Sequence, residues 1–418
     1  MRTALAQAPD DPEIMTIQAL AHAREGSRAL AGERFARAVE SSGQAPAESL
    51  RYAAFLMQDG RAGPAEGVVA DALRRVPQDP DLLAMLGSIH VERGDWARAR
   101  QAATGLRAAG DTTGDPAAAR AAAGLEVAAL RGEGRADAAV ALLETLAADG
   151  DADAMAEAVR GHLEVGDPAA AQAFLAGLLA RDPADPTARL LQAELSALAG
   201  DTAAAEAGYR ALAAEDPARP EAHRALAGLL AELGRPDEAR AAIAAGLAAT
   251  GGDAGLLFAE ASLLEAEGDV AGAIAAYETL YARDGDAPVV INNLASLLTA
   301  QGSDAATLER AFAIARRLRE SRVPEFQDTY GWILFLRGDP GEARSYLALA
   351  AAALPGNAQV QFHLGEAELA LGNRAAAKAA FNAALAAAEA GSPLPQAETA
   401  RARAAEIADP VATPPSAD

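Results

Sequence analysis

The chain has 418 residues and a formal net charge of −23 at pH 7, and 51% of its residues are hydrophobic although only 4% are aromatic. The acidity argues against binding of nucleic acid, which proteins bind mostly through Lys and Arg, and against binding to an anionic membrane surface. It favours a neutral or basic partner. Alternatively, it serves only to keep a long chain soluble. The absence of cysteine excludes disulfides, thiol catalysis and cysteine-ligated zinc, and no apolar run reaches the roughly 18 residues needed to span a bilayer.

Alanine makes up much of the hydrophobic fraction. It is the best helix former, because it loses no side-chain entropy and clashes with nothing. We find no convincing stretch in which apolar and polar β-branched residues alternate, as a half-buried strand would require. The composition therefore predicts an all-α chain.

Glycine recurs along the chain at a nearly constant interval, and seven of the ten steps between successive glycines equal 34 residues. Such a period is the signature of stacked supersecondary units, and a glycine in mid-unit permits the left-handed backbone that closes a helix. Alanine follows five residues after nearly every glycine, and proline often stands between units. Each unit is therefore predicted to be helix, short turn, helix. The turn glycines are Gly26, Gly60, Gly94, Gly134, Gly166, Gly200, Gly234, Gly268, Gly302, Gly338 and Gly372.

Residues 1–10 read as the remnant of a helix from a preceding unit, because Ala4, Leu5 and Pro9 fall within one residue of the phase of such a helix end. A half-unit at the end of an array is unfavourable, since terminal repeats usually carry a polar cap. We therefore expect this chain to be a portion of a longer protein, from which any signal or lipid anchor has been removed.

Residues 11–389 are predicted to form the repeat array, which is irregular at three places. An extra run at 111–115 lengthens the connection between the third and fourth units. Gly132 and Gly134 compete for the turn of the fourth unit, and residues 303–308 lengthen the turn of the ninth. Each is a place where the curvature of the array could change.

Two further segments follow the array. Residues 394–408 are predicted to form a polar capping helix, which a terminal repeat needs for solubility. Residues 409–418 are rich in Pro, Ala, Ser and Asp, and this composition predicts a disordered tail.

The pattern resembles the tetratricopeptide repeat family in unit length and in the positions of the small residue, glycine, alanine, large apolar residue and proline. The clearest copies are residues 325–355 and 358–384. The resemblance implies a right-handed superhelical solenoid of about eleven helix-turn-helix repeats. It also implies that the first helices line a concave inner surface and that the chain is a binding scaffold rather than an enzyme.

Few residues suggest chemistry. His22, His90 and His162 each stand four residues before a turn glycine. The three histidines occupy the same position in different units, so they are separated along the array and cannot surround one ion. We therefore favour a packing role over a shared metal site. We find no Gly-rich phosphate loop after a strand and no Gly-x-Ser-x-Gly elbow. We therefore expect no catalytic residue, no metal and no cofactor.

The repeat phase indicates which residues of each first helix should line the inner surface. In most units these residues are Ala, Leu, Arg and Glu, but in three consecutive units near the C-terminus they include asparagine and aromatic residues. Asn offers donors and an acceptor to an extended peptide backbone, and aromatic rings supply anchoring area at low entropic cost. We therefore predict a peptide groove, although Trp332, Phe335 and Phe362 would alternatively pack against the capping helix and the neighbouring unit. The predicted groove residues are Asn292, Asn293, Ser296, Asp328, Thr329, Trp332, Phe335, Phe362, His363 and Glu366.

The same units, through residues 292–295, 328–332 and 362–365, are similar to the C-terminal repeats of bacterial envelope tetratricopeptide proteins, including lipoproteins of PEP-CTERM exopolysaccharide systems. That resemblance implies a protein-binding scaffold in the periplasm or envelope, without membrane insertion of its own. An alternative is the substrate-recruiting or regulatory region of a larger enzyme whose catalytic domain lies outside this chain. A cytoplasmic co-chaperone is a third reading, which the acidic composition disfavours.

Overall fold

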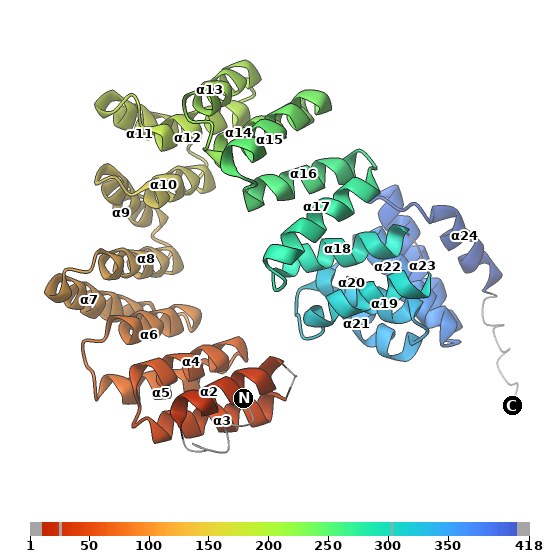
Figure 1. Cartoon of the computed structure of the whole chain (residues 1–418), viewed down its shortest axis with the longest axis horizontal. Coiled ribbons are helices and arrows are strands. Elements are labelled where there is room, and N and C mark those ends of the chain that lie inside the picture. The colour runs from red at the N-terminus through yellow and green to blue at the C-terminus, as the bar shows by residue number, and fades with distance from the viewer. Residues whose placement is uncertain (1–10, 25–26, 302–303, 408–418) are drawn as a thin grey trace, which may run out of the picture. The chain divides into compact units, whose positions relative to one another are not determined.

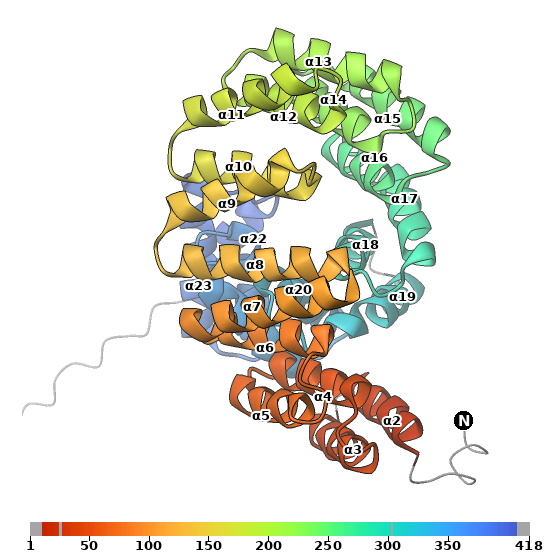
Figure 2. The same ribbon diagram turned by 90° about the vertical axis from the view of Figure 1, so that its left-hand side faces the viewer.

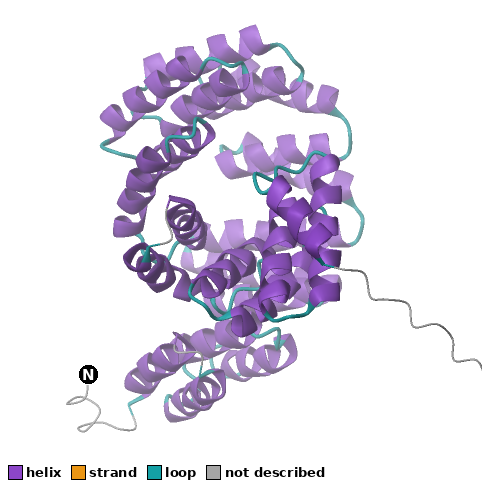
Figure 3. Cartoon of the chain, turned by 90° about the vertical axis from the view of Figure 1, so that its right-hand side faces the viewer, coloured by secondary structure: helices purple, strands orange, loops and turns teal. Residues whose placement is uncertain are grey.

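The structure, a computed structural model, describes residues 11–24, 27–301 and 304–407. Within these ranges every regular element is a helix and no strand occurs, as Figure 3 shows, so the all-α prediction is confirmed. No helix of the described part is both long and apolar enough to cross a membrane. The predicted remnant at 1–10, the tail at 409–418 and the turn glycines Gly26 and Gly302 lie outside the described residues.

The helices of the described residues follow one another as eleven pairs and a final single helix (Figure 1). The first helices of the pairs are α2 (Pro12–Arg24), α4 (Pro46–Gln58), α6 (Pro80–Glu92), α8 (Pro116–Gly132), α10 (Ala152–Glu164), α12 (Pro186–Leu198), α14 (Pro220–Glu232), α16 (Ala254–Ala266), α18 (Pro288–Gln301), α20 (Pro324–Leu336) and α22 (Ala358–Ala370). The second helices are α3 (Arg28–Ser41), α5 (Ala62–Leu73), α7 (Trp96–Thr113), α9 (Ala136–Ala148), α11 (Pro168–Arg181), α13 (Thr202–Glu215), α15 (Pro236–Thr250), α17 (Val270–Arg283), α19 (Ala305–Ala315), α21 (Pro340–Ala353) and α23 (Arg374–Glu389). The 3₁₀ turn η1 (Arg316–Leu318) continues α19, and α24 (Ala397–Glu406), which lies within the predicted capping segment, packs against α23.

The chain divides into two compact units, Met1–Gly208 and Tyr209–Asp418, with the boundary inside α13. In the first unit the pairs α6/α7 and α8/α9 lie side by side (Figure 2), and α6 also contacts α8. In the second unit α14 contacts α16, α18 contacts α20, and α20 contacts α22. In both units, several first helices of neighbouring pairs therefore touch each other as well as their own partners.

Proline, glycine and aspartate set the ends of the helices. Proline occupies the first turn of many first helices, such as Pro324 of α20, where its missing N–H would have had no helical partner. Every predicted turn glycine within the described residues has a positive φ, for example 89° at Gly338. The following Asp339 caps α21, because its carboxylate accepts a 3.0 Å hydrogen bond from the backbone N–H of Glu342. The sequence prediction used the glycines but missed these aspartate caps, although Gly-Asp recurs at many of the turns.

The structure answers two questions that the predicted irregularities raised, and for the first the expectation was wrong. The extra residues near 111–115 do not lengthen a loop; they extend α7 to 18 residues and α8 to 17 residues. Gly114 ends α7 with a left-handed φ of 69°, and Asp115 caps α8 at once. Gly134 forms the turn of the fourth pair with a φ of 74°. Gly132 is instead the last residue of α8.

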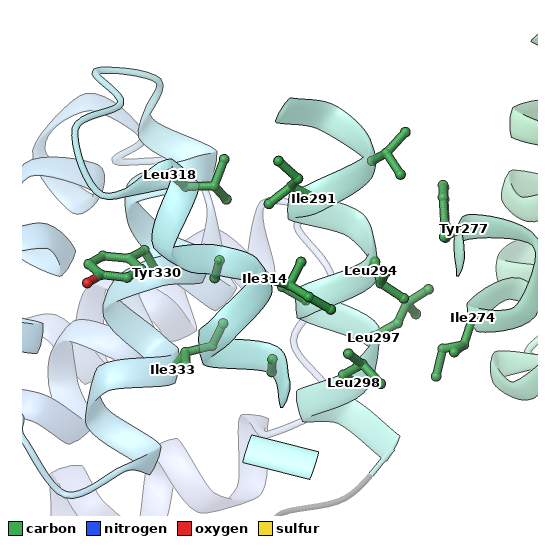
Figure 4. Close-up of a cluster of buried hydrophobic side chains, with 14 of the residues drawn as sticks. Ile274, Tyr277, Ile291, Leu294, Leu297, Leu298, Ile314, Leu318, Tyr330 and Ile333 are labelled. Atoms are coloured by element: carbon green, nitrogen blue, oxygen red, sulfur yellow. The ribbon is translucent and has the colours of Figure 1, made fainter. Parts of the chain in front are cut away.

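The core of each unit consists of several apolar clusters between packed helices. Figure 4 shows one from the second unit, in which Ile274 and Tyr277 of α17 face Leu294 and Leu297 of α18. A small residue stands seven positions before several of the turn glycines, as Gly331 does before Gly338, and the packing of the two helices explains it. A Cβ on Gly331 of α20, for instance, would come within 2.9 Å of Leu347 in α21. This close approach explains why a small side chain recurs at that phase.

Candidate functional site

The ten predicted groove residues all lie in the second unit, on the first helices α18, α20 and α22. Because α18 contacts α20 and α20 contacts α22, the structure brings these three segments together, although they are about a repeat apart in sequence. We call the surface formed by these ten side chains the first-helix face. Its members differ in how many of their hydrogen bonds and packing contacts are made with other residues of the protein.

A buried hydrogen-bonded pair connects the last two of these helices. The Nδ1 atom of His363 on α22 lies 2.9 and 3.0 Å from the two carboxylate oxygens of Asp328 on α20. Its Nε2 atom lies 2.8 Å from the amide nitrogen of Gln359. With the imidazole neutral and its proton on Nδ1, the ring donates to Asp328 and accepts from Gln359. Sequence reasoning found Asp328 and His363 but missed Gln359, which stands one helical turn before the histidine.

Trp332 is held by aromatic stacking inside the protein. Its indole ring stacks on His363 with ring centroids 4.0 Å apart and on Phe335 with centroids 5.0 Å apart. The indole also packs against the apolar cluster around Phe362 and remains half-buried. A ligand would therefore meet the open part of this ring rather than stack freely on it.

The two asparagines of α18 belong to a second polar chain. The amide of Asn292 donates to the side-chain oxygen of Asn293 over 3.2 Å, and the amide of Asn293 donates to the Tyr277 hydroxyl over 2.9 Å. Burial raises the pKa of Tyr277, and the hydrogen bonds from Asn293 and Ser262 oppose this rise. The side-chain oxygen of Asn292 is buried and accepts no hydrogen bond from any described residue. Sequence reasoning missed the Tyr277 partner, because the repeat phase identifies a face and not a side-chain pair.

Two predicted groove residues are directed toward the capping helix. Phe362 is 5% exposed and packs with Phe381 of α23 and with Ala400, Ala404 and Ile407 at the C-terminal end. The Glu366 carboxylate lies 3.3 Å from the guanidinium of Arg403 on α24. For Phe362 this is the packing arrangement that the sequence left open as an alternative to peptide binding.

The remaining predicted residues range from buried to open. Thr329 is 8% exposed, whereas Ser296 of α18 is exposed. Since Ser296 follows Asn292 by four residues, it lies on the same side of α18. Ser296 is therefore the member of the first-helix face that a partner can reach without disturbing an internal contact.

No group of three or more His, Asp or Glu side chains among the described residues is arranged to hold a metal ion. His90 is 4% exposed in α6, and His162 lies 2.8 Å from the Glu144 carboxylate. The first-helix face thus offers hydrogen bonds and partly open aromatic surface to a partner.

Comparisons with known proteins agree with the repeat pattern. Two family models described as tetratricopeptide repeat match the chain, one at residues 197–257 and the other at residues 56–112 and 156–220. No match was found among curated proteins.

Several solved structures are similar to the chain. The structure of the APC/C hetero-tetramer Cut9–Hcn1 is 12% identical, with 96% of this chain and 98% of that chain covered and a TM-score of 0.48. Yeast Tom70 is 14% identical, with 95% of each chain covered and a TM-score of 0.43. A thermophilic TPR protein of Thermus thermophilus, TTC0263, is 24% identical over 45% of this chain and 98% of its own, with a TM-score of 0.35.

Proposed function

We propose that this chain, which belongs to the tetratricopeptide repeat superfamily, is a non-catalytic protein-binding scaffold that takes an extended peptide on the first-helix face of α18, α20 and α22. The observation that supports this most directly is the grouping of Ser296, Trp332 and the Asn292–Asn293 pair on first helices that touch one another. Internal hydrogen bonds hold the asparagines and the histidine in place, so little side-chain freedom would be lost on binding.

The partner that we propose is a neutral or basic segment. The chain carries a net charge of −23, and Glu325 lies exposed at the start of α20. Opposite charge on the partner would raise the rate of encounter more than the final affinity. From the sequence resemblance of the last repeats, we further propose that this partner belongs to a bacterial envelope or polysaccharide-export assembly.

A blocking substitution at Ser296 tests the peptide site with little risk to the fold, because Ser296 is exposed and its side chain makes no described hydrogen bond. Peptides selected from a display library on the full wild-type chain would be titrated against Ser296→Arg by fluorescence polarisation. The matched control is Ala275→Arg, which adds the same side chain at an exposed position of the second helix α17.

The proposal expects Ser296→Arg to weaken binding by at least about tenfold, since a bulky group in the site removes contact area and adds a like charge to a basic peptide. The control is expected to change the dissociation constant by less than about twofold. Selected peptides that bind Ser296→Arg and wild type equally would refute a site on this face. If both variants lost the same affinity for the peptide, the added positive charge alone would explain the effect, and the binding site would not lie at Ser296.

A further inference from the structure

One short segment has a charge opposite to that of the rest of the chain. Residues 310–322 contain five arginines and a single carboxylate, Glu320, in a protein whose net charge is −23. We call Arg316, Arg317, Arg319 and Arg322 the arginine cluster. It runs from η1, at the end of α19, into the loop that leads to α20.

Two members of the arginine cluster have weak or exposed carboxylate partners. Arg317 lies 3.1 Å from Asp286, whose side chain is 74% exposed. Arg319 lies 3.9 Å from Glu342, which is too far for a hydrogen bond. Exposed ion pairs of this kind contribute little to stability, so these guanidinium groups can be shared with another anion.

The other two members have no carboxylate partner at all among the described residues. Arg316 and Arg322 are both exposed and take part in no ion pair there. A cation at the end of a helix interacts favourably with the helix dipole, which gives Arg316 a structural reason to be present. Arg322 lies in the loop beyond η1, and that explanation does not extend to it.

Tyrosine side chains flank the arginine cluster on both neighbouring second helices. On α17, Tyr281 accepts a hydrogen bond from Arg317, whose guanidinium carbon lies 5.5 Å from the centre of its ring. On α21, Tyr346 packs edge-to-face on Tyr330 with ring centroids 5.0 Å apart. Arg319 forms a side-chain hydrogen bond with Tyr346, which places this tyrosine beside the arginine cluster. Burial raises the pKa of Tyr330, and the charges of Arg319 and Arg316 oppose that rise.

We propose that the arginine cluster, with Tyr281 and Tyr346 at its sides, is a second docking surface that binds an acidic segment of a partner protein. Guanidinium groups bind carboxylates through paired, charge-assisted hydrogen bonds, and Arg and Tyr are among the side chains enriched at energetically dominant interface positions. The negative charge elsewhere on the chain does not prevent this, because salt screens exposed charges beyond about 8 Å at physiological ionic strength. This surface involves second helices and η1, so it is separate from the first-helix face.

The test measures binding of a fluorescently labelled Glu-rich peptide to the full chain, with the same peptide carrying Gln in place of Glu as the comparison. The variant is the double substitution R316E/R322E, which removes no described intramolecular ion pair. The control is R224E/R401E, which makes the same change of net charge at two exposed arginines on α14 and α24 of the same unit. Thermal melts followed by circular dichroism verify that both variants stay folded.

The expected result is that wild type binds the Glu-rich peptide, with an affinity that falls as salt is added, and binds the Gln peptide much more weakly. R316E/R322E is expected to lose at least about tenfold in affinity, as truncated or reversed contacts to a charged partner do, and the control is expected to lose much less. The proposal is overturned if the control loses as much as R316E/R322E, if both peptides bind equally, or if the Glu-rich peptide does not bind at low salt. Ser296→Arg is expected to leave this binding unchanged, which separates the outcome from that for the first-helix face.

Discussion

Gly132, at the end of α8, lies directly against the indole ring of Trp96 at the start of α7, and a Cβ built on this glycine would come within 2.5 Å of two atoms of the ring. Gly132, which the sequence offered beside Gly134 as a turn glycine, is therefore a packing residue between the third and fourth pairs. The need for space, and not a left-handed backbone, accounts for its presence, because Gly134 provides the turn.

Gly132→Ala is expected to lower the unfolding free energy by about 1–3 kcal/mol, the usual range for overpacking. That loss outweighs the about 0.5–1 kcal/mol that alanine gains over glycine inside a helix. Chemical unfolding followed by circular dichroism measures the effect. In a Trp96→Ala background the same substitution should be neutral or stabilising, and an equal loss in both backgrounds would show that Trp96 is not the cause.

A second pair of glycines in the second unit separates close packing from helix propensity. A Cβ on Gly365 of α22 would come within 2.6 Å of the Phe381 ring, whereas a Cβ on Gly228 of α14 would meet nothing within 4 Å. Gly365→Ala is expected to destabilise the chain by about 1–3 kcal/mol, and Gly228→Ala to stabilise it by about 0.5–1 kcal/mol. The unfolding midpoint should fall for Gly365→Ala and rise for Gly228→Ala. Shifts of the same sign would contradict the claim that close packing determines the effect at Gly365.

The fold was predictable because the pairs stack with one geometry, so the same small residue recurs wherever α20 approaches α21 or α22 approaches α23. Gly331 and Gly365 share one phase, seven residues before the turn glycines Gly338 and Gly372, and both lie at close contacts. The extension of α7 and α8 was not predictable by the same argument, since the residues added there break the period. Local signals, the Gly114–Asp115 pair above all, were needed instead.

The candidate site was predictable only in part. The phase places Asp328 and His363 on first helices, but their hydrogen bond joins side chains 35 residues apart and depends on the rotamers that the neighbouring helices allow. For the same reason the sequence could not show which internal partners Trp332 and Asn293 have, and it left packing of Trp332 open as an alternative to ligand binding. The structure shows that each already has an internal partner, so alanine at either position should lower stability as well as remove a side chain from the predicted groove.

His90 gives the first unit a pH-dependent stability. Burial lowers the pKa of His90 below its usual value of 6.5, although the carboxylates of Glu66 and Asp95 oppose the shift, and its Nδ1 atom has no hydrogen-bond partner among the described residues. The folded state therefore holds the neutral ring, and the unfolded chain takes up a proton as the pH falls below 6.5. This contribution to stability is present above that pH and is lost below it.

The variant His90→Gln has no titratable group at this position, so it tests whether His90 causes the pH dependence of stability. The difference in unfolding free energy between wild type and this variant should shrink from about pH 7.5 to about pH 5.5, by no more than about 1.4 kcal/mol for each pH unit below the usual histidine pKa. Denaturant titrations of both proteins at each pH provide the measurement. A difference that is constant with pH would mean that His90 is protonated equally in the folded and unfolded chains.

The hydrogen bond between Asn293 and Tyr277 links the first-helix face to the core of the second unit. Tyr277 is fully buried and its hydroxyl lies 2.9 Å from the Asn293 amide. Asn293→Ala and Tyr277→Phe are each expected to cost about 0.5–1.5 kcal/mol of unfolding free energy, the net value of a typical hydrogen bond. In the double variant the two losses should not add, because the second substitution removes a bond that the first has already broken. Fully additive losses would show that the amide and the hydroxyl act independently, and the position of Asn293 would then have to be held by its bond to Asn292 alone.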